Sequence, residues 1–288
     1  MDKRKILEIL NRAQAKGAVV EIKLTVISKA NLKEAEKANI LADYTKSAIL
    51  YYSLYKKEKS VSKKMMYGIR LVQELINASN LDKAEEILSE MEKVSGDKKY
   101  MGAIWEKRGW IADCRDKWSE EIECFRKAKE IYESIPESLG TEGRKKDRLS
   151  TVEHFMARAL YFRGKKEDLM ECEKLFSKNL SEYKKLKSDD GIAYNYSWLA
   201  RAYIAMNNLK EAEKMALFSK KYFRKAAKVQ GEFLNGYAYR VMSQLKLAKG
   251  NKEEAVDDAI ESLRYMLPQG TYYNGVIEAV KCIVEASE

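Results

Sequence analysis

Side chains that commonly carry out catalysis are scarce in this 288-residue chain. It has one histidine, His154, and four cysteines that show no CxxC spacing and no neighbouring histidine. A Cys/His zinc site is therefore limited to a single imidazole. The GxSxG, HExxH and Walker-type patterns of hydrolases, metalloproteases and phosphate-binding enzymes do not occur in the sequence. These observations favour a binding protein over an enzyme, and we expect no cofactor and no metal.

The four thiols are interpreted as small apolar core residues of a cytoplasmic protein. They are Cys114, Cys124, Cys172 and Cys282. Every apolar run is interrupted by charge before it could cross a bilayer, and the first residues, "MDKRKILEILNRAQ", lack the unbroken apolar stretch of a signal peptide. We therefore expect a cytoplasmic location and no membrane association.

Positive charge is the clearest clue to a partner. The chain carries 54 Lys and Arg against 44 Asp and Glu, a formal net charge of +10. This balance favours an acidic protein or peptide, or a nucleic acid, although a surface that only keeps the chain soluble explains it equally well. Four cations in "SKKYFRKAAK" share one helical face and are called the basic stripe: Lys221, Arg224, Lys225 and Lys228. Phosphate backbones bind such stripes, but no nucleic-acid motif accompanies this one, so a solvated face is the favoured interpretation.

Helices must position all of these side chains. Apolar residues recur every three or four positions almost throughout, and the breaks between such segments contain Gly, Asp, Asn and Pro. Ser150 and Glu153 have the spacing of a capping box, which predicts a helix start there. The pattern predicts an all-α chain of roughly twelve to fourteen helices.

One phrase is repeated four times along the chain. "ANLKEAEKAN" (30–39) and "NNLKEAEKMA" (207–216) are nearly identical, and "SNLDKAEEIL" (79–88) and "KGNKEEAVDD" (249–258) are looser copies. Each copy has a turn residue, then charged residues, then an alanine: Ala35, Ala84, Ala212 and Ala255. A small residue there lets the second helix of a hairpin approach the first closely.

The helix before each copy carries a second pattern. In 194–216, Leu199 and Ala200 are followed by Tyr203 and then by the turn; 105–128 and 241–263 match less completely. This combination resembles the tetratricopeptide repeat (TPR), W-x2-L-G-x2-Y followed by A-x3-F. The small residues of the first helices fall at Val72, Gly109, Ala157, Ala200 and Ser243, with an earlier, weaker unit centred on Lys23 and Ala35. Their period, about 37 to 48 residues, is longer than the usual 34.

The resemblance implies an all-α, right-handed α-solenoid of about six TPR-like hairpins. We expect a single domain over residues 1–288. It would comprise an N-terminal helix at 1–15, repeats at 16–266 and a C-terminal capping helix at 271–288, since the last repeat of a stack needs a cover.

In the TPR family the first helix of each pair lines a concave groove. Family positions next to the small residues then imply a peptide-binding groove formed by Trp110, His154, Arg158, Tyr194, Arg201, Tyr237, Arg240 and Gln244. Guanidinium forks suit carboxylates or phosphates, and tyrosine adds flat contact area. The opposing interpretation, that these arginines pair with neighbouring carboxylates, is equally well supported.

The resulting hypothesis is a non-catalytic scaffold or receptor module that binds a peptide or protein segment, of acidic character, in its groove. Two alternatives stay open: a nucleic-acid-associated protein that uses the basic stripe, and a regulatory sensor module acting with a separate effector chain. Homo-oligomer formation through an uncapped end is also open.

Overall fold

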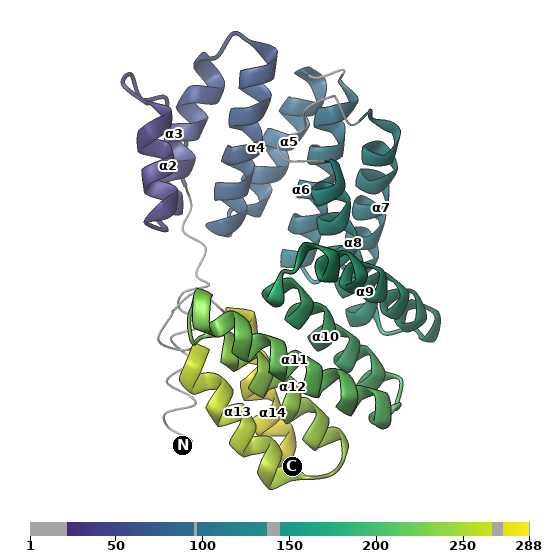
Figure 1. The fold of residues 1–288 in the computed structure, drawn as a ribbon. Coiled ribbons are helices and arrows are strands. Elements are labelled where there is room, and N and C mark those ends of the chain that lie inside the picture. Colours follow the sequence, from purple (N-terminus) through teal and green to yellow (C-terminus); the bar gives the residue numbers. More distant parts are fainter. Residues whose placement is uncertain (1–21, 95–96, 137–144, 267–272, 288) are drawn as a thin grey trace. The chain divides into compact units, whose positions relative to one another are not determined.

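The structure is a computed structural model, and it describes residues 22–94, 97–136, 145–266 and 273–287. Within these ranges the chain forms thirteen α-helices and no strand. This confirms the predicted all-α class and the predicted number of helices. Figure 1 shows the helices following one another along the chain, most of them joined by short turns. The expected helix at 1–15 lies outside the described residues.

The described residues form two compact units, which we call the N-terminal unit (22–159) and the C-terminal unit (160–287). In the N-terminal unit, consecutive helices pack against one another as α2 on α3, α4 on α5 and α6 on α7. The bounds are α2 Leu32–Ile40, α3 Tyr44–Lys57, α4 Val61–Asn77, α5 Leu81–Val94, α6 Lys98–Cys114, α7 Trp118–Ser134 and α8 Lys145–Arg163, whose last turn belongs to the C-terminal unit.

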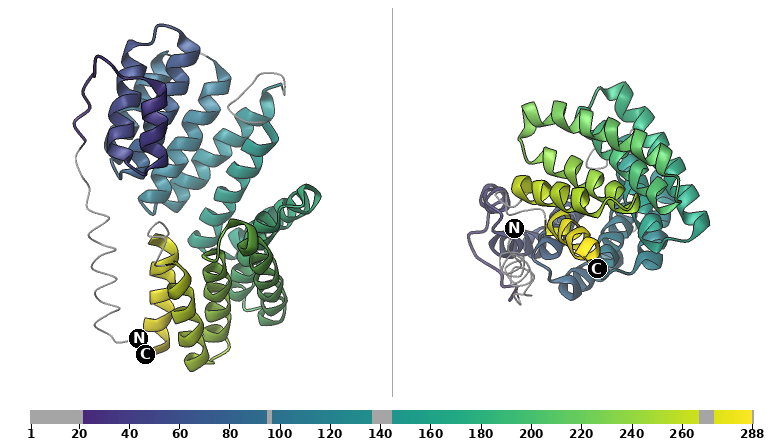
Figure 2. Two further views of the ribbon diagram at one scale, coloured as in Figure 1. Left: turned by 60° about the vertical axis from the view of Figure 1, so that its left-hand side comes forward. Right: turned by 90° about the horizontal axis from the view of Figure 1, so that it is seen from below.

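The C-terminal unit is built in two layers of helices. In one layer, α12 contacts both α10 and α14. In the other layer, α11 packs against α10 and α12, and α13 packs against α12 and α14 (Figures 1 and 2). The bounds are α9 Lys166–Leu186, α10 Asp189–Ala205, α11 Leu209–Gln230, α12 Leu234–Ala248, α13 Lys252–Met266 and α14 Tyr273–Ser287. The arrangement places residues of α10, α12 and α14 side by side on one face.

The repeated phrase forms helix starts. Asn31 and Asn208 are N-cap residues whose side-chain oxygens accept hydrogen bonds from the amides of Glu34 and Glu211, at 2.9 and 3.4 Å. These bonds satisfy amides that the first turn of a helix leaves free. In the last copy Gly250 has φ +83°, a left-handed conformation that glycine adopts without strain. Each copy therefore begins a helix, and the last three copies also lie where the preceding helix ends.

The small residues lie where the helices cross. The alanines of the four copies are fully buried, and so are Val72, Ala157, Ala200 and Ser243. At Gly109 an added Cβ would lie 2.8 Å from the ring of Phe125 on the following helix. The close approach predicted from the repeats is confirmed.

Three local predictions were wrong. Residues 22–27, around Lys23, are not helical, because the amides of Ile22 and Ile27 donate to the side chains of Asn80 and Ser53. Helix α8 begins at Lys145, so Ser150 lies inside the helix and caps nothing. Cys114 is exposed at the end of α6, whereas the other three cysteines are buried as expected.

Candidate functional site

Two buried arginines of the C-terminal unit share one carboxylate. Arg201 on α10 and Arg240 on α12 contact opposite oxygens of Glu278 on α14, with Nη–Oε distances of 3.1 Å each. The arginines are only 3% and 6% exposed. Guanidinium groups are costly to bury and are normally matched by enough acceptors to satisfy their five N–H groups. We call Arg201, Arg240 and Glu278 the arginine–glutamate triad.

The triad has more donors than acceptors. Within the described residues, Nε and Nη1 of Arg201 and Nε of Arg240 are buried without a hydrogen-bond partner. The side-chain oxygen of Gln244, one helical turn after Arg240, is buried without a partner as well. Two positive groups against one negative group leave an excess positive charge in a site almost closed to water. The excess of guanidinium N–H groups is suited to an anionic ligand, whereas the Gln244 oxygen needs a hydrogen-bond donor.

The pKa values of the two arginines respond differently to this site. Burial lowers the pKa of Arg240, and repulsion from Arg201 acts in the same direction against the attraction of Glu278. Burial also acts to lower the pKa of Arg201, but Glu278 and the phenol of Tyr161 outweigh it, so that pKa is raised. Both guanidiniums stay charged at neutral pH, since arginine titrates far above it.

Aromatic rings form the walls of the triad. The guanidinium carbon of Arg201 lies 4.1 Å from the ring centroid of Trp198 and 4.8 Å from that of Tyr161. Arg240 lies 5.0 Å from the ring of Tyr237, which itself contacts Tyr194 at 5.2 Å. Ring faces attract cations and exclude water, which holds the guanidinium planes in place.

The structure divides the eight residues predicted for the groove between the two units. Tyr194, Arg201, Tyr237, Arg240 and Gln244 belong to the C-terminal unit, and the first four are linked through the contacts just described. The N-terminal unit holds Trp110, His154 and Arg158, which gather around Phe155 of α8 with centroid distances of 4.3, 5.4 and 5.0 Å. Their common role in ligand binding stays a prediction.

Acidic groups accompany Arg158 in the N-terminal unit. Its Nη2 lies 3.4 Å from Asp113 of α6. Burial raises the pKa of Glu121 on α7 to about 9, with repulsion from Asp113 adding to the effect. Both oxygens of Glu121 are buried without a hydrogen-bond partner in the described part of the chain. Glu121 is therefore protonated at neutral pH.

Sequence reasoning missed Glu278. The repeat pattern predicts the terminal helix only as a cover for the last repeat and does not relate Glu278 to the arginines of the preceding first helices. The signal that could have found Glu278 is the alternation of helices between two layers. If α14 continues the layer of α10 and α12, an acid on its inward face lies opposite their inward arginines.

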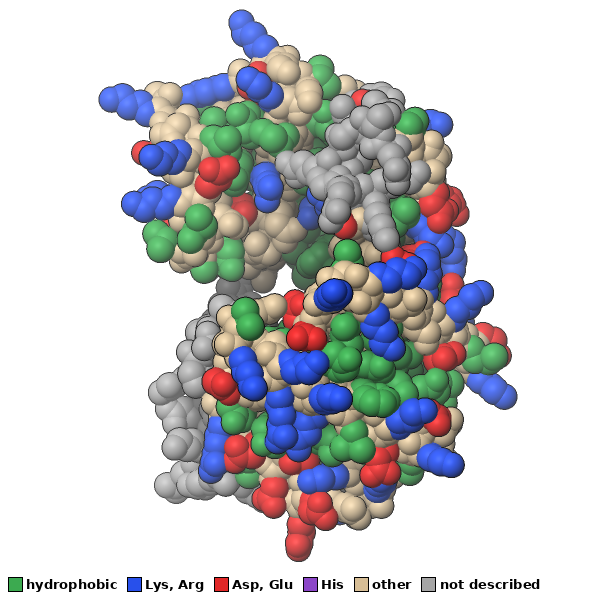
Figure 3. All heavy atoms as spheres, in the orientation of Figure 1, with side chains coloured by type: hydrophobic (Ala, Val, Ile, Leu, Met, Phe, Trp, Pro, Cys, Tyr) green, Lys and Arg blue, Asp and Glu red, His purple; other side chains and the backbone are tan. Residues whose placement is uncertain are grey.

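The basic stripe is exposed on α11. Lys221, Arg224, Lys225 and Lys228 form no ion pair with the described residues, although the ammonium of Lys225 lies 4.8 Å from the ring of Tyr222. Figure 3 shows Lys and Arg side chains gathered over α11 and its neighbours. The stripe is thus accessible to an anionic surface.

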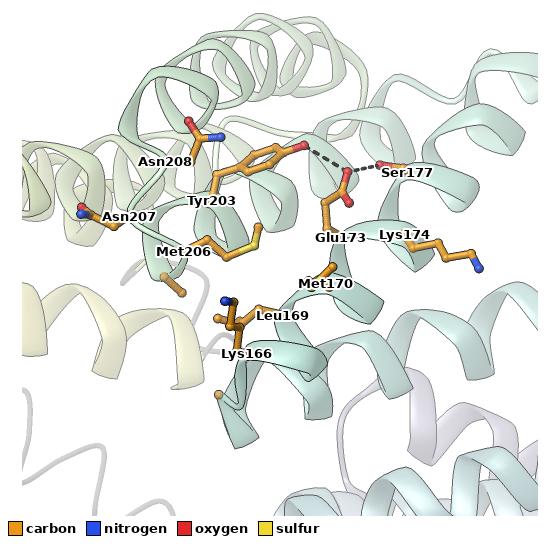
Figure 4. A pocket seen from close by; sticks show the side chains of 12 residues that line it. Lys166, Leu169, Met170, Glu173, Lys174, Ser177, Tyr203, Met206, Asn207 and Asn208 are labelled. Carbon is orange, nitrogen blue, oxygen red and sulfur yellow. Dashed lines mark hydrogen bonds between the residues drawn. The ribbon is translucent and has the colours of Figure 1, made fainter.

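An open pocket of about 1070 Å³ lies between α9 and the turn from α10 to α11. Leu169, Met170 and Met206 line its apolar part, and Tyr203 points across it to donate a hydrogen bond to Glu173 at 3.1 Å (Figure 4). Burial raises the pKa of Tyr203 to about 12, with Glu173 contributing. The pocket can accept an apolar side chain.

Neither a metal cluster nor a membrane span is found among the described residues. No three His, Cys, Asp or Glu side chains converge there as ligands would. None of the described helices combines the length and apolar character that a bilayer crossing requires.

Solved structures with this fold are recognisable despite low sequence identity. A Rap protein complexed with Competence and Sporulation Factor matches with a TM-score of 0.63 and 13% identity, over 100% of this chain and 78% of that one. BtubC (BKLC) from P. vanneervenii matches with a TM-score of 0.57 and 14% identity, over 93% of each chain. A putative kinesin light chain from Podospora anserina has nearly identical TPR-like repeats. It matches with a TM-score of 0.52 and 17% identity, over 69% of this chain and 94% of that one.

No protein-family model and no curated protein matches the sequence. The likeness to solved structures nevertheless establishes the architecture: the chain has a TPR-like, all-α solenoid fold. The resemblance inferred from the repeated phrase is confirmed at the level of the fold.

Proposed function

We propose that this chain is a non-catalytic interaction module that binds an acidic peptide or protein segment through Arg201 and Arg240. The observation that carries the proposal is the unequal triad, in which two buried guanidiniums share one carboxylate and keep unpartnered N–H groups. A ligand carboxylate at this position can accept hydrogen bonds from these N–H groups. Charge-assisted hydrogen bonds of this kind are among the strongest that proteins form.

The surroundings and the fold support the same role. Trp198 and Tyr237 give the site rigid aromatic walls, which are typical of peptide-binding surfaces. A Rap protein with the same fold has been solved in complex with Competence and Sporulation Factor, which agrees with a ligand-binding use of such a scaffold. The proposal includes one domain over residues 1–288 and a cytoplasmic location.

The test is fluorescence anisotropy with a fluorescein-labelled hexaglutamate peptide, with hexaglutamine as the neutral control. Arg240→Met should weaken hexaglutamate binding at least tenfold, because the clamp loses one of its two forks. The variant keeps Arg201 and Glu278 as a balanced pair, so the fold should survive. Arg264→Met is the matched control, since Arg264 is an exposed arginine of α13 that pairs only locally, with Glu261.

Two results would reject the proposal. One is equal binding of hexaglutamate and hexaglutamine. The other is an equal loss of hexaglutamate affinity in Arg240→Met and Arg264→Met, which would indicate a response to net charge alone.

The exposed, unpaired basic stripe supports a second candidate function, binding to a nucleic-acid backbone. Replacing Lys221, Arg224, Lys225 and Lys228 with Gln should weaken binding to single-stranded RNA and reduce its dependence on salt, because fewer counterions are released. The same variant should bind hexaglutamate as the wild type does. RNA affinity that is unchanged in this variant would remove the second candidate.

A further inference from the structure

Glu278 occupies the position that a ligand carboxylate needs. It bridges α10 and α12 by giving one oxygen to each arginine. Both arginines are at least nine-tenths buried and both contact Glu278, so a ligand carboxylate that takes this position displaces that of Glu278. Binding at this site therefore requires an exchange.

The charge of the site determines what can take part in that exchange. Withdrawal of Glu278 alone would leave two buried cations without a counterion, which is strongly unfavourable. A carboxylate that arrives as Glu278 leaves keeps the balance unchanged. Neutral or basic segments offer no such compensation.

The helix that carries Glu278 has fewer neighbouring helices than α12 has. Among the described helices, α14 packs on α12 and α13, whereas α12 is covered by α10, α11, α13 and α14. Its apolar contacts come from Ala279, Val280, Cys282 and Ile283, which are buried in the core of the C-terminal unit. A segment that replaces the whole of α14 must therefore offer both an acid and an apolar stripe at helical spacing, whereas a purely acidic peptide such as hexaglutamate can exchange only with the Glu278 carboxylate.

We propose that α14 is an internal ligand of the C-terminal unit, and that the external ligand is an amphipathic helical segment that replaces it. The segment carries a Glu or Asp followed at the first, second, fourth and fifth positions by small or apolar residues, as in "EAVKCIV" (278–284). This inference rests on the proposed function and adds a regulatory consequence, since occupation of the site releases the C-terminal helix.

The probe for this exchange is a fluorescein-labelled peptide with the chain's own sequence 273–287. It carries C282S, so that its mass differs from that of the internal helix and the two can be told apart in the hydrogen-exchange experiment below. A second peptide carries E278Q in addition. An internal competitor acts at a high effective concentration, commonly millimolar for a short linker. Wild-type protein should therefore bind the acidic peptide weakly, and the full-length Glu278→Gln variant should bind it at least tenfold more tightly.

The second peptide separates charge from apolar contact. It should show no comparable gain, since it cannot supply the carboxylate that the variant lacks. Equal affinity of the acidic peptide for wild type and Glu278→Gln would overturn the inference. The proposed function would still stand if hexaglutamate binding depends on Arg240.

Hydrogen exchange of the wild-type chain gives a result that does not depend on the stability of the variant. A saturating amount of the acidic peptide should reduce the protection of amides in α14 and leave those of α10 unchanged. Unchanged protection of α14 at saturation would show that the peptide binds elsewhere and would also overturn the inference.

Discussion

Arg201 and Glu278 are 77 residues apart in the sequence, and their side chains meet at 3.1 Å in the C-terminal unit. The contact joins the first helix of one hairpin to the terminal helix, across the intervening α12. Arg240 of α12 shares the same carboxylate. The stability of the C-terminal unit and the proposed ligand binding therefore involve the same three side chains.

Glu278 and Arg201 should differ in how much they contribute to stability. Glu278→Gln leaves two buried cations uncompensated and should cost about 3 to 5 kcal/mol of unfolding free energy. Arg201→Met leaves Arg240 and Glu278 as a balanced pair and should cost clearly less. Urea denaturation followed by circular dichroism gives both values. A larger loss of unfolding free energy for Arg201→Met than for Glu278→Gln would contradict this argument from charge balance.

The protonated Glu121 predicts a stability that falls with rising pH. Its pKa is about 9 in the folded protein against a reference value of 4.5, so the folded state binds the proton more tightly. The favourable contribution is complete below about pH 4.5 and is lost progressively as the pH rises to about 9.

Glu121→Met should remove this dependence. Since it also removes two unpartnered oxygens, the variant should be about 1 to 3 kcal/mol more stable than wild type at pH 7 to 8. The gain should shrink toward pH 4.5. Glu120→Met is the control, because Glu120 is the preceding residue and is exposed; a similar gain there would point to a general charge effect.

His154 predicts the opposite dependence on pH. Burial, with a smaller contribution from Arg158, lowers its pKa to about 3 from 6.5. Its contribution to stability is present above about pH 6.5 and is lost as the pH falls from there toward 3. His154→Gln cannot titrate, so its unfolding midpoint should fall less steeply than that of wild type between pH 6.5 and 4. Parallel curves for the two proteins would refute this assignment.

Gly109 should be required for the packing of α6 on α7. Helix propensity favours alanine over glycine by about 1 kcal/mol, yet an added Cβ would lie 2.8 Å from the Phe125 ring. Overpacking of this kind costs about 1 to 3 kcal/mol, so Gly109→Ala should destabilise the protein in spite of its propensity. Adding Phe125→Leu should cost less than the sum of the two single changes, because the substitutions relieve the same contact. Additive losses would mean that the ring adjusts freely.

The fold could be predicted because its determinants are local and repeated. The spacing of apolar residues, the asparagines that cap α2 and α11, and the buried alanines each act within one or two turns of helix. Repetition made the pattern recognisable even in 105–128 and 241–263, which match the family less completely than 194–216 does. Predictions failed where a distant partner decides the structure, as at Ile22 and Ile27, whose amides bind side chains of other elements.

The sequence by itself determined the helical hairpins, the small residues between them and the presence of inward arginines on successive first helices. Only the tertiary structure decided what those arginines face. The partner of Arg201 comes from a helix that local periodicity cannot place, since a 3.1 Å ion pair depends on how three helices stack rather than on the order of their residues. Burial of Glu121 and of the triad is likewise a property of packing, and it acts on the pKa values of Glu121 and the two arginines.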